Sequence, residues 1–144
     1  MVIKVSEGVE YEAAFNGFTP IVFSRAFTVD KLNASGEPTG IKRPKDINED
    51  VGMIVESMQA CGMPAMAALL EIFYACIKTA NRKFDVPFDA WVESLPAEAF
   101  DLQKGDGWAA DVMGIVEDNF FPSTPDGVEA APAEKTRPTA SKQS

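Results

Sequence analysis

The sequence predicts a mainly α fold of the α+β type, in which an N-terminal β-hairpin packs on a compact bundle of about four to five helices. Two observations lead to this prediction: short alternating runs open the chain, and longer runs with helical periodicity follow them. A third observation sets the extent of the fold. After residue 121 the chain is rich in Pro, Ala, Ser, Thr and Glu, so we expect residues 1–121 to fold and residues 122–144 to form a disordered tail or linker.

The opening residues alternate between apolar and polar side chains, as strands do. Two such runs, Val2–Ser6 and Val9–Glu12, are separated by Glu7 and Gly8. Alternation on both sides of a glycine turn is typical of a β-hairpin, which needs a helical layer against one face to be stable. The first predicted element is therefore a hairpin over the first twelve residues.

The first predicted helix follows this hairpin. Thr19 before Pro20 supplies a predicted N-cap and a first-turn proline for a helix that runs through Phe27. Its larger apolar contributions to the core are expected to be Ile21, Phe23 and Phe27. Residues 30–45 then contain two glycines and two prolines, a density of helix and strand breakers that predicts a loop.

The second helix is predicted to begin at Asp46, because Glu49 stands three positions later in the spacing of a capping box. Cys61 and Gly62 end it, and Pro64 begins the next helix. Apolar side chains follow helical spacing within it: Val51, Ile54, Val55 and Met58.

Residues 63–77 are apolar except for Glu71, which predicts a buried central helix. The run is shorter than the roughly 20 apolar residues that a bilayer requires, and we therefore expect no transmembrane helix there. Two amphipathic helices are predicted afterwards, one following Pro87 and one beginning near Asp106 and ending before Pro122. Their apolar faces are expected to consist of Phe88, Trp91, Val92 and Leu95 in the first, and Trp108, Val112, Ile115, Val116 and Phe120 in the second.

The charge of the chain disfavours two classes of partner. Asp and Glu total 22 against 13 Lys and Arg, which gives a net charge of −9, and the excess lies on the part predicted to fold. Such a surface repels phosphate backbones and anionic lipid head groups, so we expect no nucleic-acid partner and no membrane partner. The basic cluster Lys42, Arg43 and Lys45 lacks interleaved aromatic residues and is interpreted as part of a solvated loop.

The residues usual in catalysis and metal binding are scarce. The chain has no histidine, and Cys61 and Cys76 form no CxxC pair, so we expect no metal, no cofactor and no enzymatic activity. Both cysteines lie in apolar helical sequence, and we expect them to be buried and reduced. Ser24 has no partnering base. Asp85, Asp89 and Glu93 stand four apart and are interpreted as a solvated helix face.

Three aromatic residues are candidates for binding a partner, because aromatic side chains provide large contact area for few frozen torsions. These residues are Trp91, Phe120 and Phe121. The alternative for each is packing in the core, and the sequence leaves both interpretations open. No secretory signal is predicted at Met1–Val5, and we expect a cytoplasmic location.

Six phrases distributed over the predicted folded part resemble one protein family. They are residues 17–25 (GFTPIVFSR), 43–48 (RPKDIN), 73–76 (FYAC), 88–92 (FDAWV), 95–102 (LPAEAFDL) and 116–122 (VEDNFFP). Together they are similar to tail assembly chaperones of long-tailed, siphovirus-type bacteriophages, of the kind found in actinobacterial phages.

The resemblance implies a non-enzymatic protein of the host cytoplasm that binds the tape measure protein, keeps it soluble and promotes assembly of the tail tube protein around it. Such a chaperone leaves before the tail is finished and is absent from the mature virion. A frameshifted longer form with an additional domain is a further partner that the resemblance implies. The alternatives are a tail structural or completion protein retained in the virion and, third, an unrelated acidic adaptor or regulator.

Overall fold

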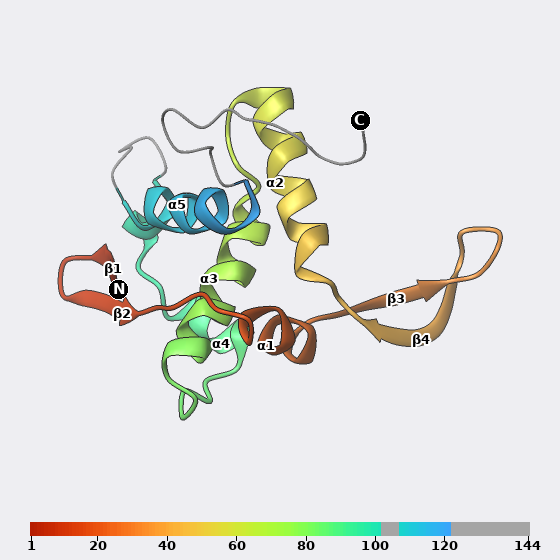
Figure 1. Cartoon of the computed structure of the whole chain (residues 1–144), viewed down its shortest axis with the longest axis horizontal. Helices are drawn as coiled ribbons and strands as arrows, with labels where there is room; N and C mark the ends of the chain where they lie inside the picture. Colours follow the sequence, from red (N-terminus) through yellow and green to blue (C-terminus); the bar gives the residue numbers. More distant parts are fainter. Residues whose placement is uncertain (102–106, 122–144) are drawn as a thin grey trace, which may run out of the picture.

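The computed structural model describes residues 1–101 and 107–121. It is an α+β fold with two small antiparallel hairpins and helices gathered around α3, as the sequence predicts (Figure 1). The predicted tail, residues 122–144, lies outside the described residues. In chain order the elements are β1 (Val2–Ser6), β2 (Val9–Glu12), α1 (Thr19–Ala26), β3 (Thr28–Leu32), β4 (Pro38–Pro44), α2 (Ile47–Cys61), α3 (Met66–Ala80), α4 (Phe88–Glu93), the 3-10 helix η1 (Ala97–Phe100) and α5 (Trp108–Phe120).

The N-terminal hairpin forms as predicted and packs on the helices by one face. Gly8 lies in the turn with φ +78°, a conformation that side chains with a Cβ disfavour. Ile3 pairs with Tyr11 in the antiparallel ladder, and both Ile3 and Val5 are buried. The alternation seen in the sequence thus points one row of side chains into the core.

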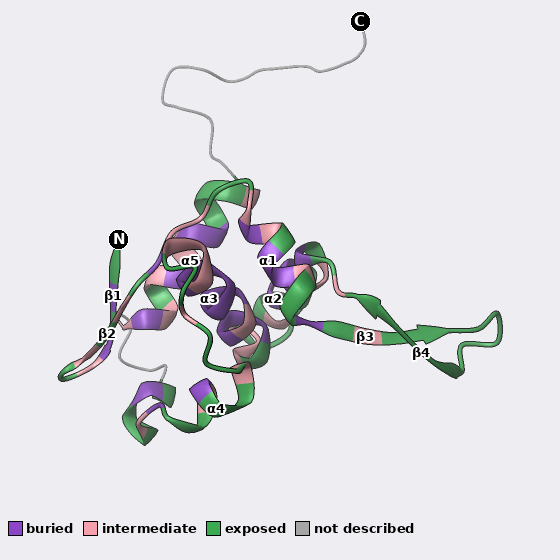
Figure 2. Ribbon diagram, turned by 90° about the horizontal axis from the view of Figure 1, so that it is seen from below, coloured by how far each residue is buried: buried purple, intermediate pink, exposed green. Residues whose placement is uncertain are grey.

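Helix α3 is the predicted buried centre of the fold. Nine of its fifteen residues are buried, and Figure 2 shows buried residues concentrated on it. The helix begins at Met66, two residues after the predicted start at Pro64, because the backbone is still extended at its N-cap Ala65. Contacts with α1, α2 and α5 leave few of its positions in contact with solvent.

Aromatic side chains from three other elements meet at Phe73 in the middle of α3. The Trp108 ring stacks on it at a centroid distance of 5.5 Å, whereas Trp91 and Tyr11 approach it edge-on at 5.4 and 6.1 Å. Such ring pairs stabilise a core beyond the area that they bury. Phe73 therefore joins β2, α4 and α5 in one core.

Replacing Phe73 by alanine is expected to lower the free energy of unfolding by roughly 3 to 5 kcal/mol, because a fully buried ring is lost from a site with little room to collapse. Denaturant unfolding followed by circular dichroism measures the change. Phe121→Ala is the matched control, since that ring is 53% exposed and its loss should cost less than about 0.5 kcal/mol. A loss below about 1 kcal/mol for Phe73→Ala would contradict the placement of the core.

Helix α1 differs from the prediction at its start and on one face. Its N-cap is Phe18 rather than Thr19, and the Thr19 hydroxyl instead accepts a hydrogen bond from the Asn16 amide and bonds the hydroxyl of Thr79 on α3. Phe23 and Phe27 are buried as expected, together with Val22. Ile21 is 46% exposed, so its predicted place in the core is wrong: the buried residues of α1 are Thr19, Val22 and Phe23.

Helix α2 begins with the predicted capping box. The Asp46 carboxylate accepts a hydrogen bond from the Asn48 amide at 2.8 Å, and the Asp46 amide donates to Glu49 at 3.0 Å. Gly62, with φ +77°, ends the helix as expected. Val51 and Ile54 are buried, whereas Met58 points to solvent.

The loop predicted over residues 30–45 is wrong: most of that segment forms the β3–β4 hairpin, which projects from the helical body (Figure 1). The breakers occupy the positions where strands tolerate them. Gly36 and Gly40 adopt positive φ, Gly36 in the connecting turn, while Pro38 and Pro44 lie at the two ends of β4. The hairpin is almost entirely exposed, so no apolar pattern revealed it.

The basic cluster in this hairpin is paired with carboxylates. Lys42 binds Asp30 on the opposite strand, and Arg43 makes a two-pronged contact with Glu49 at 2.8 and 3.0 Å. Hydrogen bonding to Arg43 lowers the pKa of Glu49 to about 2. These ion pairs hold the basic cluster at the base of the hairpin, next to α2.

Lys45 joins the hairpin to two helices through a buried charge network. Its Nζ lies 2.7 Å from Oδ1 of Asp50 on α2 and 3.0 Å from Oε1 of Glu71 on α3. Asp50 is fully buried. Burial, together with the nearby Glu71 carboxylate, raises the pKa of Asp50 to about 7 in spite of the opposing effect of Lys45.

This network makes stability depend on pH, and Asp50→Asn isolates the effect. Because the folded-state pKa lies above that of an unfolded aspartate, the folded protein retains a proton that the unfolded chain releases, and stability is lost as pH rises from about 4 to about 7. Asparagine does not titrate. The free energy of unfolding of Asp50→Asn relative to the native protein should therefore rise with pH across this window, with a slope of up to about 1.4 kcal/mol per pH unit.

Urea unfolding at intervals between pH 4.5 and 8 measures this difference. Asp89→Asn, which removes one carboxylate from the exposed side of α4, is the control for the change in net charge. A difference between Asp50→Asn and the native protein that stays constant over the window would contradict the raised pKa.

Candidate functional site

Trp91, the first predicted partner-binding residue, is a core residue. It is 1% exposed, and its ring contacts Tyr11, Phe73 and Tyr74. Its indole Nε1 is buried without a hydrogen-bond partner among the described residues. The structure therefore offers no surface at Trp91 to a partner, and of the two interpretations open for this residue, core packing is the one observed.

Phe120 and Phe121 lie at the C-terminal end of α5 and differ in exposure. The Phe120 ring is half-buried against Phe15 at a centroid distance of 5.4 Å, whereas Phe121 is 53% exposed. Neither shares a ring contact with Trp91, so the structure does not bring the three residues together. A partner-binding role for Phe120 and Phe121 stays a prediction.

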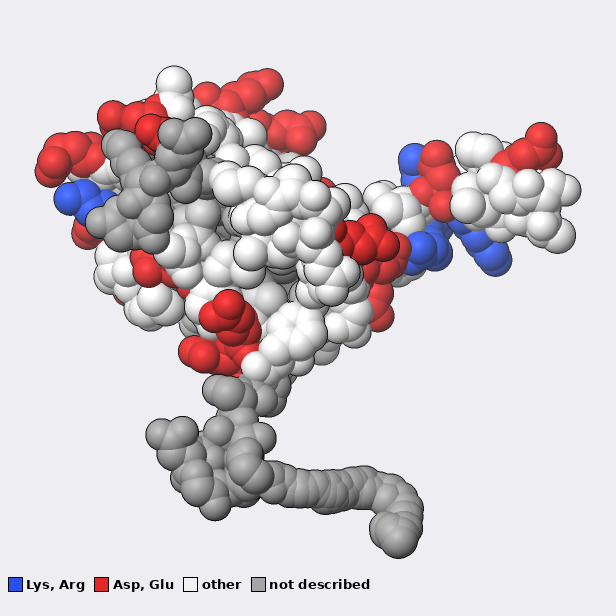
Figure 3. Space-filling view, turned by 90° about the horizontal axis from the view of Figure 1, so that it is seen from above, with Lys and Arg blue, Asp and Glu red and all other residues white. Residues whose placement is uncertain are grey.

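An uncharged surface lies at the end of the molecule where a turn connects α2 to α3. No charged residue occurs between Glu56 and Glu71, and residues 58–63 are all exposed. Figure 3 looks down on this end and shows a broad area without charged side chains, bordered by acidic groups. Cys61 belongs to this surface, so the expectation that both cysteines are buried is wrong for Cys61.

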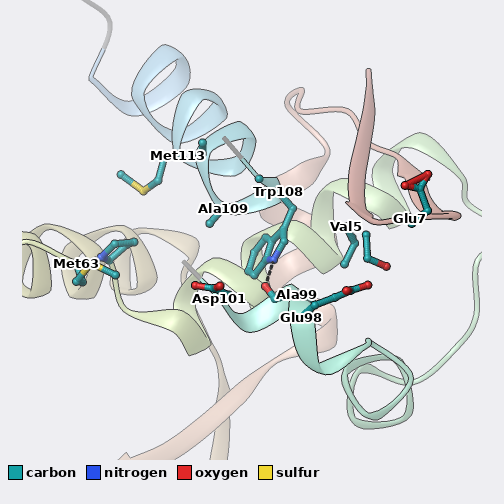
Figure 4. A pocket seen from close by; sticks show the side chains of 13 residues that line it. Val5, Glu7, Met63, Glu98, Ala99, Asp101, Trp108, Ala109 and Met113 are labelled. Atoms are coloured by element: carbon teal, nitrogen blue, oxygen red, sulfur yellow. Dashed lines mark hydrogen bonds between the residues drawn. The ribbon is translucent and has the colours of Figure 1, made fainter. Parts of the chain in front are cut away.

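An apolar groove of about 400 Å³ opens beside this surface. The α2–α3 turn contributes Met63 and Pro64, and α5 contributes Met113, whose side chain extends toward the side on which Met63 lies (Figure 4). Trp108 closes the groove from within, because its ring is buried and its indole Nε1 donates a hydrogen bond to the Ala99 carbonyl. We call this site the methionine groove; its described lining consists of Val5, Ser6, Glu7, Met63, Pro64, Glu98, Ala99, Asp101, Gly107, Trp108, Ala109, Ala110 and Met113.

The charged side chains in this described lining are all carboxylates. Glu7 comes from the hairpin turn, Glu98 from η1 and Asp101 from the segment after it. Lys4 approaches Glu7 at 3.7 Å, in a pair too exposed to neutralise the rim strongly. The groove therefore combines an apolar interior with a negative rim and suits an apolar side chain carried on a positively charged segment.

Two features of the sequence could have located this groove. Five of the six methionines, all but Met1, lie in α2, in the turn after it, in α3 or in α5, and the run between Glu56 and Glu71 has no charge. Methionine is flexible and polarizable, and it is common at surfaces that accept varied apolar partners. That Met63 and Met113 face one opening follows only from the packing of α5 beside the turn.

The predicted cap of α5, Asp106, lies outside the described residues, and the observed N-cap is Gly107.

The residues considered for catalysis lie outside the lining of the methionine groove. The Ser24 hydroxyl donates to the Lys45 carbonyl, and burial raises the pKa of the Cys76 thiol to about 12, which keeps it protonated. Asp85, Asp89 and Glu93 are exposed. Within residues 1–101 and 107–121, no group of three or more His, Cys, Asp or Glu residues could hold a metal ion.

In the same described ranges, no helix has the length and apolar character needed to cross a membrane. Comparison of the chain with protein-family models, with curated proteins and with solved structures finds no match. The methionine groove and the resemblance of the six sequence phrases are therefore the two features that indicate a function.

Proposed function

We propose that the protein is a phage tail assembly chaperone whose methionine groove binds an amphipathic helix of the tape measure protein. The observation that carries this proposal is the open apolar groove between Met63 and Met113, with its carboxylate rim. Its volume of about 400 Å³ lies within the range of about 300 to 1,000 Å³ that is usual for sites that enclose apolar groups.

The chemistry of the groove specifies the kind of client segment. A helix presents apolar anchors at positions i, i+3 or i+4, and i+7, and one or two such anchors would enter between the two methionines. Lysine or arginine residues flanking the anchors would meet Glu7, Glu98 and Asp101. Because methionine adapts to varied shapes, one groove can accept successive segments of a long helical client.

The other partners follow from the same assignment. The chaperone would hold the tape measure protein soluble in the host cytoplasm until the tail tube protein assembles around it, and would then leave. A net charge of −9 favours dispersion of such a complex. A frameshifted longer form that retains residues 1–121 would carry the same groove, because its described lining residues all lie in that range.

The leading alternative is a tail structural or completion protein, and composition of the virion separates it from the chaperone. Mass spectrometry of purified particles is expected to detect the tube and tape measure proteins without this chain, because a chaperone departs before completion. Lysate from the same infection is the positive control for detection. Recovery of the chain from particles in a fixed ratio to the tube protein would replace the chaperone assignment by the structural one.

Met63→Glu tests the groove directly. The substitution places a fourth carboxylate in an apolar opening, and it is expected to weaken binding of the tape measure protein by at least about tenfold, or about 1.4 kcal/mol. Co-expression of the two proteins measures soluble complex, and titration of the purified components measures affinity. Binding by the native chain should also weaken as salt increases, because the rim acts through charge.

Met53→Glu is the matched control, since Met53 is 45% exposed against 41% for Met63 and does not line the groove. It should bind the client as the native chain does. Phe121→Ala in the same assay shows whether the end of α5 adds to the contact. Equal binding by Met63→Glu and Met53→Glu, both folded by circular dichroism, would exclude the methionine groove as the client site.

A further inference from the structure

A second hollow, of about 410 Å³, lies between α1 and the C-terminal end of α3. We call it the cationic pocket, because every charged residue in its described lining is basic. Apolar walls come from α1, and the cations come from α1, from α3 and from the turn after α3. The described lining consists of Phe18, Val22, Arg25, Ala26, Lys78 and Arg82.

The Phe18 ring holds two guanidinium groups at this pocket. Arg82 Cζ lies 4.3 Å and Arg25 Cζ 5.6 Å from its centroid. A guanidinium held against an aromatic face keeps its N–H edge available for a planar anion. Lys78 is oriented in a similar way, with its Nζ 5.5 Å from the Tyr74 ring.

These three cations lie together in one described lining without carboxylate partners. Within residues 1–101 and 107–121, none of the three forms an ion pair, whereas Lys42, Arg43 and Lys45 all do. The chain has an excess of acidic residues, so clustered cations without acidic neighbours run against its composition. The arrangement concentrates positive potential in one hollow of an otherwise acidic protein.

Stabilisation of helix ends explains part of this arrangement. Arg25 and Lys78 lie in the last turns of α1 and α3, where a cation contributes about 0.3 to 1 kcal/mol through the helix dipole. That effect requires no gathering of the cations, and it does not apply to Arg82, which follows the end of α3. The convergence of three cations on one pocket around Phe18 therefore needs a further explanation.

We infer that the cationic pocket binds an acidic peptide segment of a partner protein. One carboxylate would receive N–H donors from Arg25 and Arg82, a second would pair with Lys78, and an adjacent apolar side chain would pack on Val22 and Ala26. A peptide fits better than a nucleic acid, because a long phosphate backbone would extend from this small pocket over a chain whose net charge is −9.

This inference is independent of the proposed function, since the two sites share no lining residue and have opposite charge. The methionine groove would accept a basic amphipathic segment and the cationic pocket an acidic one. A protein with both could hold two segments of different charge, either from one partner or from two.

Fluorescence anisotropy tests the inference with a labelled peptide of sequence Glu-Glu-Leu-Glu-Glu-Leu and a matched peptide with Gln for Glu. The acidic peptide should bind the full chain and the Gln peptide should not. Arg82→Gln and Arg25→Gln should each weaken binding by about fivefold or more, because each removes a charge-assisted contact. The affinity of Arg82→Lys for the acidic peptide should lie between that of Arg82→Gln and that of the native chain, since lysine keeps the charge and loses the planar donor edge.

Lys31→Gln is the matched control, because it removes one exposed positive charge from β3, away from the pocket lining. It should change peptide affinity less than twofold. Circular dichroism is used to check that each variant is folded. Folding is expected to persist because Arg25 and Arg82 are exposed.

Three results would overturn the inference: absence of binding by the acidic peptide, equal loss of affinity in Lys31→Gln and Arg82→Gln, or unchanged affinity in both arginine variants. A competition experiment then identifies the kind of anion that the pocket binds. Displacement of the peptide by an oligothymidine, or by inorganic phosphate, at lower concentration than by unlabelled peptide would show a phosphate site instead.

Discussion

Burial of α3 is the constraint on which the rest of the structure depends. Tyr11 of β2, Trp91 of α4 and Trp108 of α5 each contact Phe73, so elements distant in sequence share one aromatic centre. Because aromatic rings bury large areas, their contacts can fix even the short β1–β2 hairpin, which would be marginal in isolation. The same centre positions the methionine groove: Trp108 stacks on Phe73, closes the groove from within and starts the helix that carries Met113.

Charge has two separate uses in this molecule. Around the base of the β3–β4 hairpin, Lys42 pairs with Asp30 across the two strands. Arg43 and Lys45 pair with Glu49, Asp50 and Glu71 on α2 and α3, which attaches the exposed hairpin to the helical body. At the two hollows, by contrast, the charged residues of the described lining are of one sign, acidic at the methionine groove and basic at the cationic pocket. The paired charges stabilise the fold, whereas charges of one sign around an apolar hollow are suited to selecting a partner of opposite charge.

The projecting hairpin illustrates why strands with few buried residues are difficult to recognise. Gly36, Pro38, Gly40 and Pro44 are the residues that predicted a loop, yet each occupies a turn, a strand end or a strand position with positive φ. Nearly all side chains on β3 and β4 are exposed, so neither strand shows the period-two pattern of a half-buried sheet. Local hydrogen bonds maintain the turn instead, with the Asn33 side chain accepting from the amides of Ser35 and Glu37.

The sequence by itself determined the elements whose signals are local. The capping box of Asp46 and Glu49, the Gly8 turn between alternating runs and the apolar run of α3 were all readable, because each depends on residues within a few positions of one another. Only the tertiary structure decided which apolar residues reach solvent. Trp91 and Met63 both lie in apolar sequence, yet one is in the core and the other lines an open groove. Periodicity defines the face of a helix, but exposure of that face depends on which distant elements pack against it.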